Sequence, residues 1–62
     1  MPEVFVYAIE GRSIEQKRSL VKKITDAVCE DYKVQPDAVS VILIDTPKHM
    51  RAKAGVLLSD KT

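Results

Sequence analysis

The sequence predicts a small α/β protomer, or α+β when its C-terminal hairpin is counted, built on one strand–helix–strand unit. Three observations support this fold class. Residues 3–9 form an unbroken run of strand-forming residues, residues 14–31 show helical periodicity, and residues 39–45 form a second apolar run. A βαβ unit has a right-handed crossover that makes its two strands parallel. We expect a single domain over residues 1–62.

The first strand, residues 3–9, has apolar side chains on both of its faces. They are Val4, Val6 and Ala8 on one face, and Phe5, Tyr7 and Ile9 on the other. Because strand residues alternate between faces, both faces of this strand are apolar, and each must be covered by other parts of the structure. Gly11 then supplies a turn.

The helix is expected to begin at Ile14 and to run to about Asp31. Ser13 and Gln16 match the capping-box pattern, in which each side chain bonds the backbone of the other residue. Apolar residues then recur at spacings of three and four, as in an amphipathic helix. They are Ile14, Leu20, Val21, Ile24, Ala27, Val28 and Tyr32. Pro36 disfavours helical geometry at the residue before it, so the helix must end upstream.

The second strand is expected at residues 39–45, which are apolar on nearly both faces, as in parallel strands that are covered on two sides. Residues 46–55 are expected to form a loop. The short apolar segment of residues 56–58 is expected to pair with a neighbouring subunit, and residues 59–62 to fray.

A chain of 62 residues needs some addition to its own core. Domains of this size bury only about 60% of the surface that the unfolded chain exposes. The single cysteine, Cys29, excludes an internal disulfide, and Cys29 and His49 fit no metal-ligand spacing. One helix covers one face of the strands, so the apolar second face predicts an oligomer.

Charge and hydropathy exclude several classes of partner. The net charge is +1, and basic residues are interspersed with acidic ones, which argues against nucleic-acid binding. No apolar run approaches the roughly 20 residues of a membrane span, and the N-terminus lacks a secretory signal pattern. The expected setting is the cytoplasm.

Pro2 directly follows Met1. If Met1 is removed, Pro2 carries a free secondary amine. An unperturbed α-amino group titrates at about 7.7 to 8.0, and a nearby cation lowers that pKa, so the amine can act as a general base near neutral pH. A proline that simply begins an edge strand would leave the same sequence, so these residues alone keep both interpretations open.

Pro2, the strand after it, the segment Glu10-Gly11-Arg12-Ser13 and a hairpin that contains Gly55 together resemble the 4-oxalocrotonate tautomerase family. The resemblance covers nearly the whole chain. It implies the tautomerase/MIF-like fold, in which βαβ protomers dimerise into a four-stranded sheet backed by two helices, and three dimers form a homohexamer. It also implies an isomerase without metal or organic cofactor, in which the amino-terminal proline moves a proton on a small 2-keto or enol carboxylate.

On this resemblance, Pro2 is the base that later acts as the acid, and Arg12 binds the substrate carboxylate. A guanidinium suits that role because its fork gives a carboxylate two parallel charge-assisted hydrogen bonds. Without the resemblance, Arg12 could merely cap a loop or pair with Glu10.

Two positions depart from the family pattern. Ser40 stands where the best-known members have a second catalytic arginine, and it can donate only one neutral hydrogen bond. Losing one preorganised donor costs about 10² to 10³ in rate, which predicts slower turnover of the muconate-type diacid. Arg51 stands where many relatives have an aromatic pocket wall. We hypothesise that Arg51, together with Lys53, replaces part of the missing charge and binds substrate; a solvated basic loop is the alternative.

Two other functions fit the same scaffold. One is hydration or dehalogenation of an unsaturated acid, in which a protonated Pro2 acts as the acid. The other is a non-catalytic oligomer that retains Met1, because Pro2 then has a tertiary amide nitrogen with no basicity.

Overall fold

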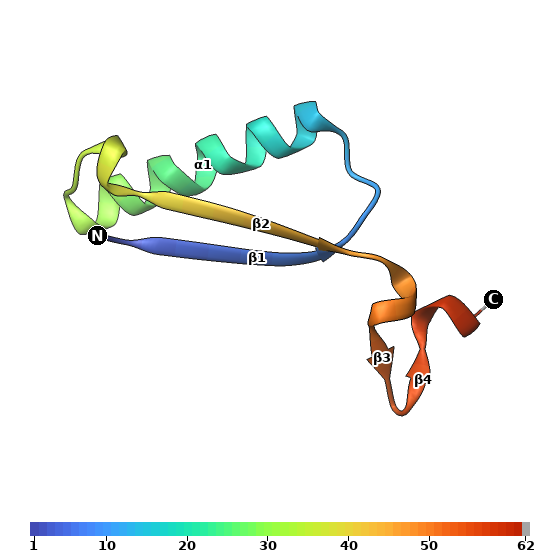
Figure 1. The fold of residues 1–62 in the computed structure, drawn as a ribbon. Helices are drawn as coiled ribbons and strands as arrows, with labels where there is room; N and C mark the ends of the chain where they lie inside the picture. Colours follow the sequence, from blue (N-terminus) through green and yellow to red (C-terminus); the bar gives the residue numbers. More distant parts are fainter. Residues whose placement is uncertain (62) are drawn as a thin grey trace.

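In the computed structural model, which describes residues 1–61, the chain forms β1, α1 and β2, followed by a small hairpin (Figure 1). β1 spans Glu3–Ile9, α1 spans Ile14–Tyr32 and β2 spans Ser40–Thr46. β1 and β2 pair in parallel, so the predicted βαβ unit is confirmed. α1 covers one face of the two strands (Figure 1). No helix among residues 1–61 is both long enough and apolar enough to cross a membrane.

The register of the two strands decides which side chains share a face. Phe5 lies opposite Ile42, and Tyr7 lies opposite Ile44. These four side chains point away from α1, because Val6 and Leu43, at the alternate positions, line the side that faces the helix. Phe5 is 53% exposed and Tyr7 is 66% exposed. The face opposite α1 is therefore apolar and uncovered within one protomer.

Both ends of α1 have local causes. The capping box between Ser13 and Gln16 is present, as predicted. At the other end, Lys33 takes the left-handed conformation with φ 57°, and its N–H donates to the Cys29 carbonyl at 3.0 Å. Such a cap satisfies one of the last carbonyls of a helix. The helix ends one residue beyond the expected Asp31.

β2 begins at Ser40, so the expected start at Val39 is wrong by one residue. Pro36–Ala38 form a short 3₁₀ turn, and the N–H of Val39 donates to the Pro36 carbonyl at 3.1 Å. That bond occupies the donor that Val39 would otherwise offer to the β-ladder. At its other end the strand reaches Thr46, one residue later than expected, because Thr46 is paired with Ile9 and its carbonyl accepts from the Glu10 N–H at 3.0 Å.

The C-terminal region is more ordered than the sequence suggested. The expected loop contains a 3₁₀ turn, Lys48–Met50, and the strand β3, Ala52–Lys53. β3 pairs antiparallel with β4, Val56–Leu57, so the predicted hairpin is confirmed, whereas pairing of this segment with a neighbouring subunit stays a prediction.

Two residues join β3 to β4. Ala54 and Gly55 have φ of 53° and 80°, as a two-residue type I′ turn requires. A second correction concerns the tail, because Leu58–Asp60 form a 3₁₀ turn where fraying was expected. Lys61 is the last described residue, and Thr62 lies outside the described residues.

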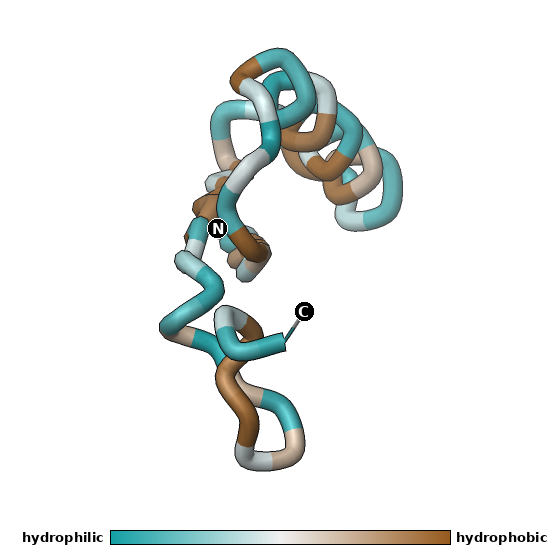
Figure 2. Tube along the Cα trace, turned by 90° about the vertical axis from the view of Figure 1, so that its right-hand side faces the viewer, coloured by the Kyte–Doolittle hydropathy of each residue, from teal (hydrophilic) through white to brown (hydrophobic). Residues whose placement is uncertain are grey.

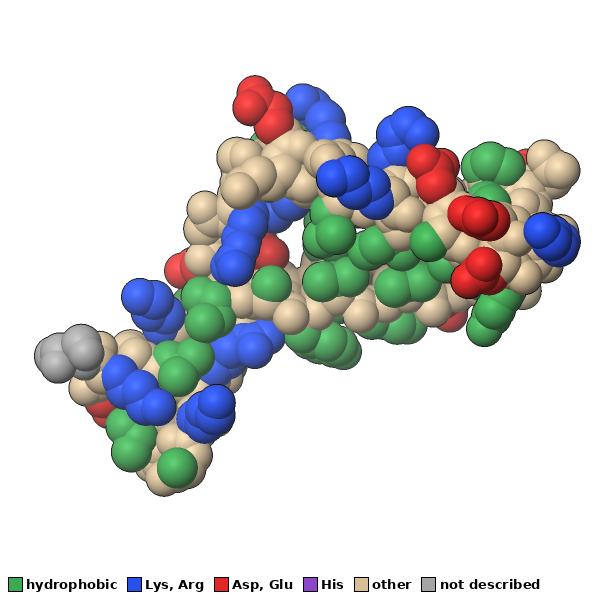
Figure 3. Space-filling model, turned by 180° about the vertical axis from the view of Figure 1, so that it is seen from behind, with side chains coloured by type: hydrophobic (Ala, Val, Ile, Leu, Met, Phe, Trp, Pro, Cys, Tyr) green, Lys and Arg blue, Asp and Glu red, His purple; other side chains and the backbone are tan. Residues whose placement is uncertain are grey.

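None of residues 1–61 is fully buried. The protomer is elongated, with extents of 44 × 24 × 13 Å, and the hairpin projects from the end of β2 on the side away from α1 (Figure 1). Apolar segments run along both strands and along α1 (Figure 2). Hydrophobic side chains lie between helix and strands and again on the outer side of the strands (Figure 3). Residues 1–61 alone bury too little surface to offset the entropy of ordering the chain, so we expect further burial against other copies.

We expect the midpoint of thermal unfolding to rise with protein concentration, because assembly stabilises only the folded state. Phe5→Asp should reduce the assembled fraction, since it places a charge on the uncovered face. Lys23→Ser, on the exposed side of α1, is the matched control and should leave assembly unchanged. Light scattering at micromolar concentration measures the mass. A folded monomer with a concentration-independent midpoint would contradict the expectation.

Candidate functional site

Pro2 lies immediately before β1 and is half-buried. Its carbonyl accepts a hydrogen bond from the Ser40 N–H at 3.0 Å, which extends the ladder by one residue. The nitrogen side of Pro2 leads to Met1, whose side chain and backbone are 92% exposed. Pro2 is thus held through its carbonyl, while its nitrogen stays outside the ladder.

A shallow hollow surrounds Pro2, between the start of β1 and the second half of α1. Its lining residues are Pro2, Glu3, Val4, Ala27, Val28, Asp31 and Tyr32. Ser40 is at the same end of the sheet, because it is the register partner of Glu3. Two of the predicted site residues, Pro2 and Ser40, are therefore neighbours at the amino end of the parallel strands.

Arg12 lies at the opposite end, in the turn between β1 and α1. Gly11 makes this turn possible with a φ of 124°, which only glycine adopts freely. The Arg12 Nη1 atom donates to the Ile9 carbonyl at 2.9 Å, so the side chain does cap the loop. Among residues 1–61 no carboxylate, including that of Glu10, forms an ion pair with Arg12. A guanidinium has five N–H donors, so most of those on Arg12 remain for an anion.

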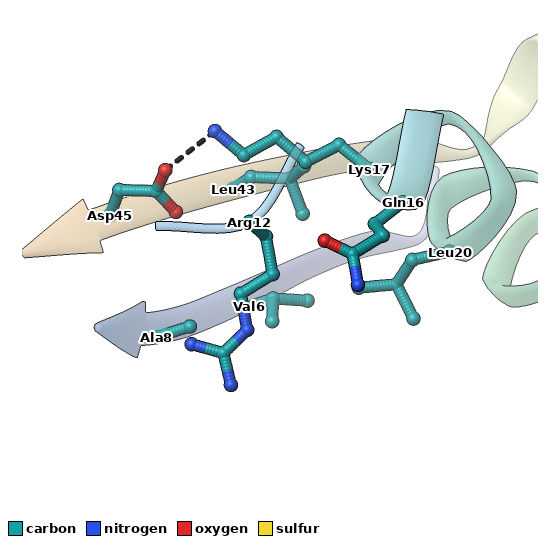
Figure 4. A pocket seen from close by; sticks show the side chains of 8 residues that line it. All are labelled: Val6, Ala8, Arg12, Gln16, Lys17, Leu20, Leu43 and Asp45. Atoms are coloured by element: carbon teal, nitrogen blue, oxygen red, sulfur yellow. Dashed lines mark hydrogen bonds and ion pairs between the residues drawn. The ribbon is translucent and has the colours of Figure 1, made fainter. Parts of the chain in front are cut away.

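A cleft of about 140 Å³ lies beside Arg12, between the first turns of α1 and the sheet (Figure 4). Its floor is apolar and its rim is charged or polar. The lining residues are Val6, Ala8, Arg12, Gln16, Lys17, Leu20, Leu43 and Asp45.

Lys17 and Asp45 form an ion pair across this cleft, with 2.5 Å between Nζ and Oδ2 (Figure 4). Their side chains are 29% and 31% exposed. The pair occupies the one carboxylate of the cleft, and the Arg12 guanidinium points away from it (Figure 4). Sequence reasoning missed this pair, because its members are far apart in the chain and meet only through the packing of α1 on β2.

Arg51 directly follows the 3₁₀ turn after β2 and is half-buried. Its Nε atom donates to the Thr46 hydroxyl oxygen at 2.5 Å, and that hydroxyl donates to the Ala8 carbonyl at 3.2 Å. Arg51 is thus tied to the ends of both strands, unlike a freely solvated loop residue. Lys53, its suggested helper, is exposed in β3.

The predicted site residues consequently form two groups. Thr46 is the register partner of Ile9, so Arg12 and Arg51 both attach to the carboxyl end of the strands. Pro2 and Ser40 lie at the amino end. β1 has seven residues, which at about 3.3 Å per residue separates the two ends by roughly 23 Å. One protomer does not bring Pro2 close to either arginine.

Other charged groups lie apart from both ends. Lys22 donates to Asp26 at 2.9 Å on the exposed side of α1, and this hydrogen bond raises the pKa of Lys22. Among residues 1–61 no cluster of histidine, cysteine and acidic residues could hold a metal ion.

Comparisons with known proteins point in one direction. Residues 2–61 match a family described as "Tautomerase enzyme". A probable tautomerase from Halalkalibacterium halodurans is 43% identical over 98% of this chain and all of its own length. The 2-hydroxymuconate tautomerase of Bacillus subtilis is also 43% identical, over 97% of each chain.

Solved structures agree with these relatives. A homologue of 4-oxalocrotonate tautomerase superimposes with a TM-score of 0.93, at 41% identity over 98% of this chain and all of its own. A heterohexameric 4-oxalocrotonate tautomerase from Chloroflexus aurantiacus gives 0.88, at 25% identity over 97% of each chain.

The Lys17–Asp45 pair should matter for anion binding at Arg12. Lys17→Met frees the Asp45 carboxylate to compete for Arg12, so binding of 2-oxohexanoate, a small keto carboxylate, should weaken about three- to fivefold. Adding Asp45→Asn should restore it. Titration calorimetry measures both. Unchanged binding in the single variant, or weak binding that persists in the double variant, would contradict this role for the pair.

Proposed function

This chain belongs to the tautomerase family, and from that premise we propose that it catalyses keto–enol tautomerisation, a 1,3-proton transfer, on small 2-keto or enol carboxylates. The observation that carries the proposal is the placement of Pro2 at the head of β1, fixed by the hydrogen bond from Ser40 and with its nitrogen outside the ladder. The name of the Bacillus subtilis relative supports an unsaturated 2-hydroxy acid as the type of substrate.

Pro2 acts as the proton carrier in this mechanism. Removal of Met1 turns its nitrogen into a secondary amine. The neutral amine takes a proton from the enol hydroxyl or from the carbon next to the carbonyl, which leaves a delocalised enolate. The protonated amine then returns a proton to another carbon of the same system, so the reaction needs no added oxidant or reductant. A nearby guanidinium would lower the pKa of the amine and keep it partly neutral near pH 7.

Arg12 binds the substrate carboxylate. Its side chain is already oriented by the bond to the Ile9 carbonyl, and Arg12 lines the cleft. The ion pair of Lys17 with Asp45 keeps the cleft's own carboxylate occupied. A charged fork that is held in this way can fix the acidic carbon of a substrate next to a base.

The base and the fork must come from different copies of the chain. They lie at opposite ends of one strand pair, and a two-fold axis that pairs two protomers antiparallel places the amino end of one beside the carboxyl end of the other. The uncovered apolar face and the lack of fully buried residues in the described part of the chain support such an assembly. We expect a dimer with a four-stranded sheet and two helices, and three such dimers in a homohexamer, for which the heterohexameric relative is a precedent.

Ser40 and Arg51 complete the proposed substrate contacts. Ser40 lies beside Pro2 and offers one neutral donor to the enolate oxygen. Arg51 supplies a second cation from the arginine end of another protomer. Together they replace in part the second arginine that the best-known family members carry.

Pro2→Ala and Arg12→Ala should each lower kcat/KM for the ketonisation of 2-hydroxymuconate. We expect a loss of at least tenfold for Pro2→Ala, since a general base contributes about 10² to 10⁴ and the new terminal amine keeps part of this. Arg12→Ala should lose roughly a hundredfold through the missing carboxylate contact. Arg18→Ala, an exposed arginine on α1, is the control and should match wild type. Absorbance decay of the enol measures all four rates, and equal rates would contradict the mechanism.

The intact mass of the purified chain is the necessary companion measurement. The mechanism requires a mass that lacks one methionine residue. If Met1 stays attached, Pro2 has no basic nitrogen, and a non-catalytic scaffold becomes the better description.

A further inference from the structure

Thr46 connects Arg51 to the end of β1. Its hydroxyl accepts a hydrogen bond from Arg51 Nε and donates one to the Ala8 carbonyl. A threonine hydroxyl has one hydrogen to donate, and here the strand carbonyl takes it, so its lone pairs face Arg51. Both residues are half-buried, in contrast to the exposed hairpin residues 52–57 that follow. The bond therefore lies in a partly desolvated setting, where its geometry is well defined.

The contact uses only the inner nitrogen of the guanidinium. Nη1 and Nη2 form no hydrogen bond to residues 1–61, and no carboxylate in that range forms an ion pair with Arg51. An arginine whose Nε is anchored presents its two outer nitrogens as a fork of fixed direction, the arrangement that matches a carboxylate. Arg12 is anchored to Ile9, which is the register partner of Thr46. The two guanidinium groups are therefore held by neighbouring residues at the same end of the strand pair.

Resting on the proposed function, we propose that Thr46 is a positioning residue that holds the Arg51 fork for a second carboxylate, so that the site selects keto or enol acids with a carboxylate at each end. Arg12 binds the carboxylate next to the keto group. Arg51 binds the distal one, and Thr46 sets its direction without touching the substrate. Arg51 thus supplies the positive charge that Ser40 lacks, but it does so at the distal carboxylate of the substrate.

Two ligands of equal chain length isolate the contribution of the second carboxylate to binding. 2-Oxoadipate and 2-oxohexanoate share the keto acid end and differ in a terminal carboxylate against a methyl group. Titration calorimetry should be run with wild type, Thr46→Val, Thr46→Ser, Arg51→Ala and the double variant of Thr46→Val with Arg51→Ala. Valine keeps the branched shape that suits the strand, and serine keeps the hydroxyl.

We expect Thr46→Val to weaken 2-oxoadipate about tenfold and 2-oxohexanoate less than twofold. Thr46→Ser should bind both ligands like wild type. Arg51→Ala should weaken 2-oxoadipate at least as much as Thr46→Val, and in that background Thr46→Val should cause no further loss, because the hydroxyl acts only through Arg51.

Equal weakening of both ligands in Thr46→Val would overturn the proposal, since it would indicate a general structural role. Additive losses in the double variant, or no binding of 2-oxoadipate to wild type, would overturn it as well. Because binding is measured without turnover, a failure of Pro2→Ala to slow the enol reaction would count against the proposed chemistry alone. Normal catalysis without discrimination between the two ligands would count against Thr46 alone.

Discussion

The constraint on which the rest of this structure depends is that none of residues 1–61 is fully buried. One helix covers one face of a two-stranded parallel sheet (Figure 1), and Phe5 and Tyr7 remain exposed on the other. Residues 1–61 bury little surface to offset the entropy of ordering the chain, because one face of the strands has no cover within the protomer. We therefore expect the protomer to be one part of an assembly.

The polarity of a parallel strand pair has a direct chemical consequence. Both amino ends lie together and both carboxyl ends lie together, so Pro2 and Ser40 are separated from Arg12 and Arg51 by the full length of β1. The proposed two-fold pairing would bury apolar surface and at the same time bring unlike ends together. Folding and the proposed chemistry consequently have the same requirement, and a variant that weakens assembly should lose both.

Local signals made much of the fold predictable. β1 was expected at Glu3–Ile9 and is found there, and the capping box places the start of α1 correctly, since both depend on residues close in the chain. The start of β2 was shifted by the 3₁₀ turn at Pro36–Ala38. The hairpin was predicted through the family resemblance alone, because two-residue strands have no periodicity, and Ala54 lacks the asparagine or glycine that usually marks a type I′ turn.

Some residues of the candidate site could be predicted from the sequence, and others could not. Pro2, Arg12, Ser40 and Arg51 could be named from the sequence through the family resemblance, and their roles stay proposals. Thr46 and the Lys17–Asp45 pair could not, because their contacts join residues that only the strand register and helix packing bring together. Knowledge of the strand register alone would have placed Thr46 beside Ile9. It would not have predicted the hydrogen bonds of the Thr46 hydroxyl, which depend on how the side chains are oriented.

Mixing two impaired variants tests the central claim, that the base and the carboxylate fork come from different copies. Pro2→Ala and Arg12→Ala chains should be unfolded together in equal amounts, refolded and assayed for enol decay. If each site takes its proline and its arginine from separate chains, random assembly leaves roughly a quarter of the sites with both residues, and about that share of wild-type activity should return. Activity no higher than the mean of the two variants alone would contradict the claim and place the whole site within one chain.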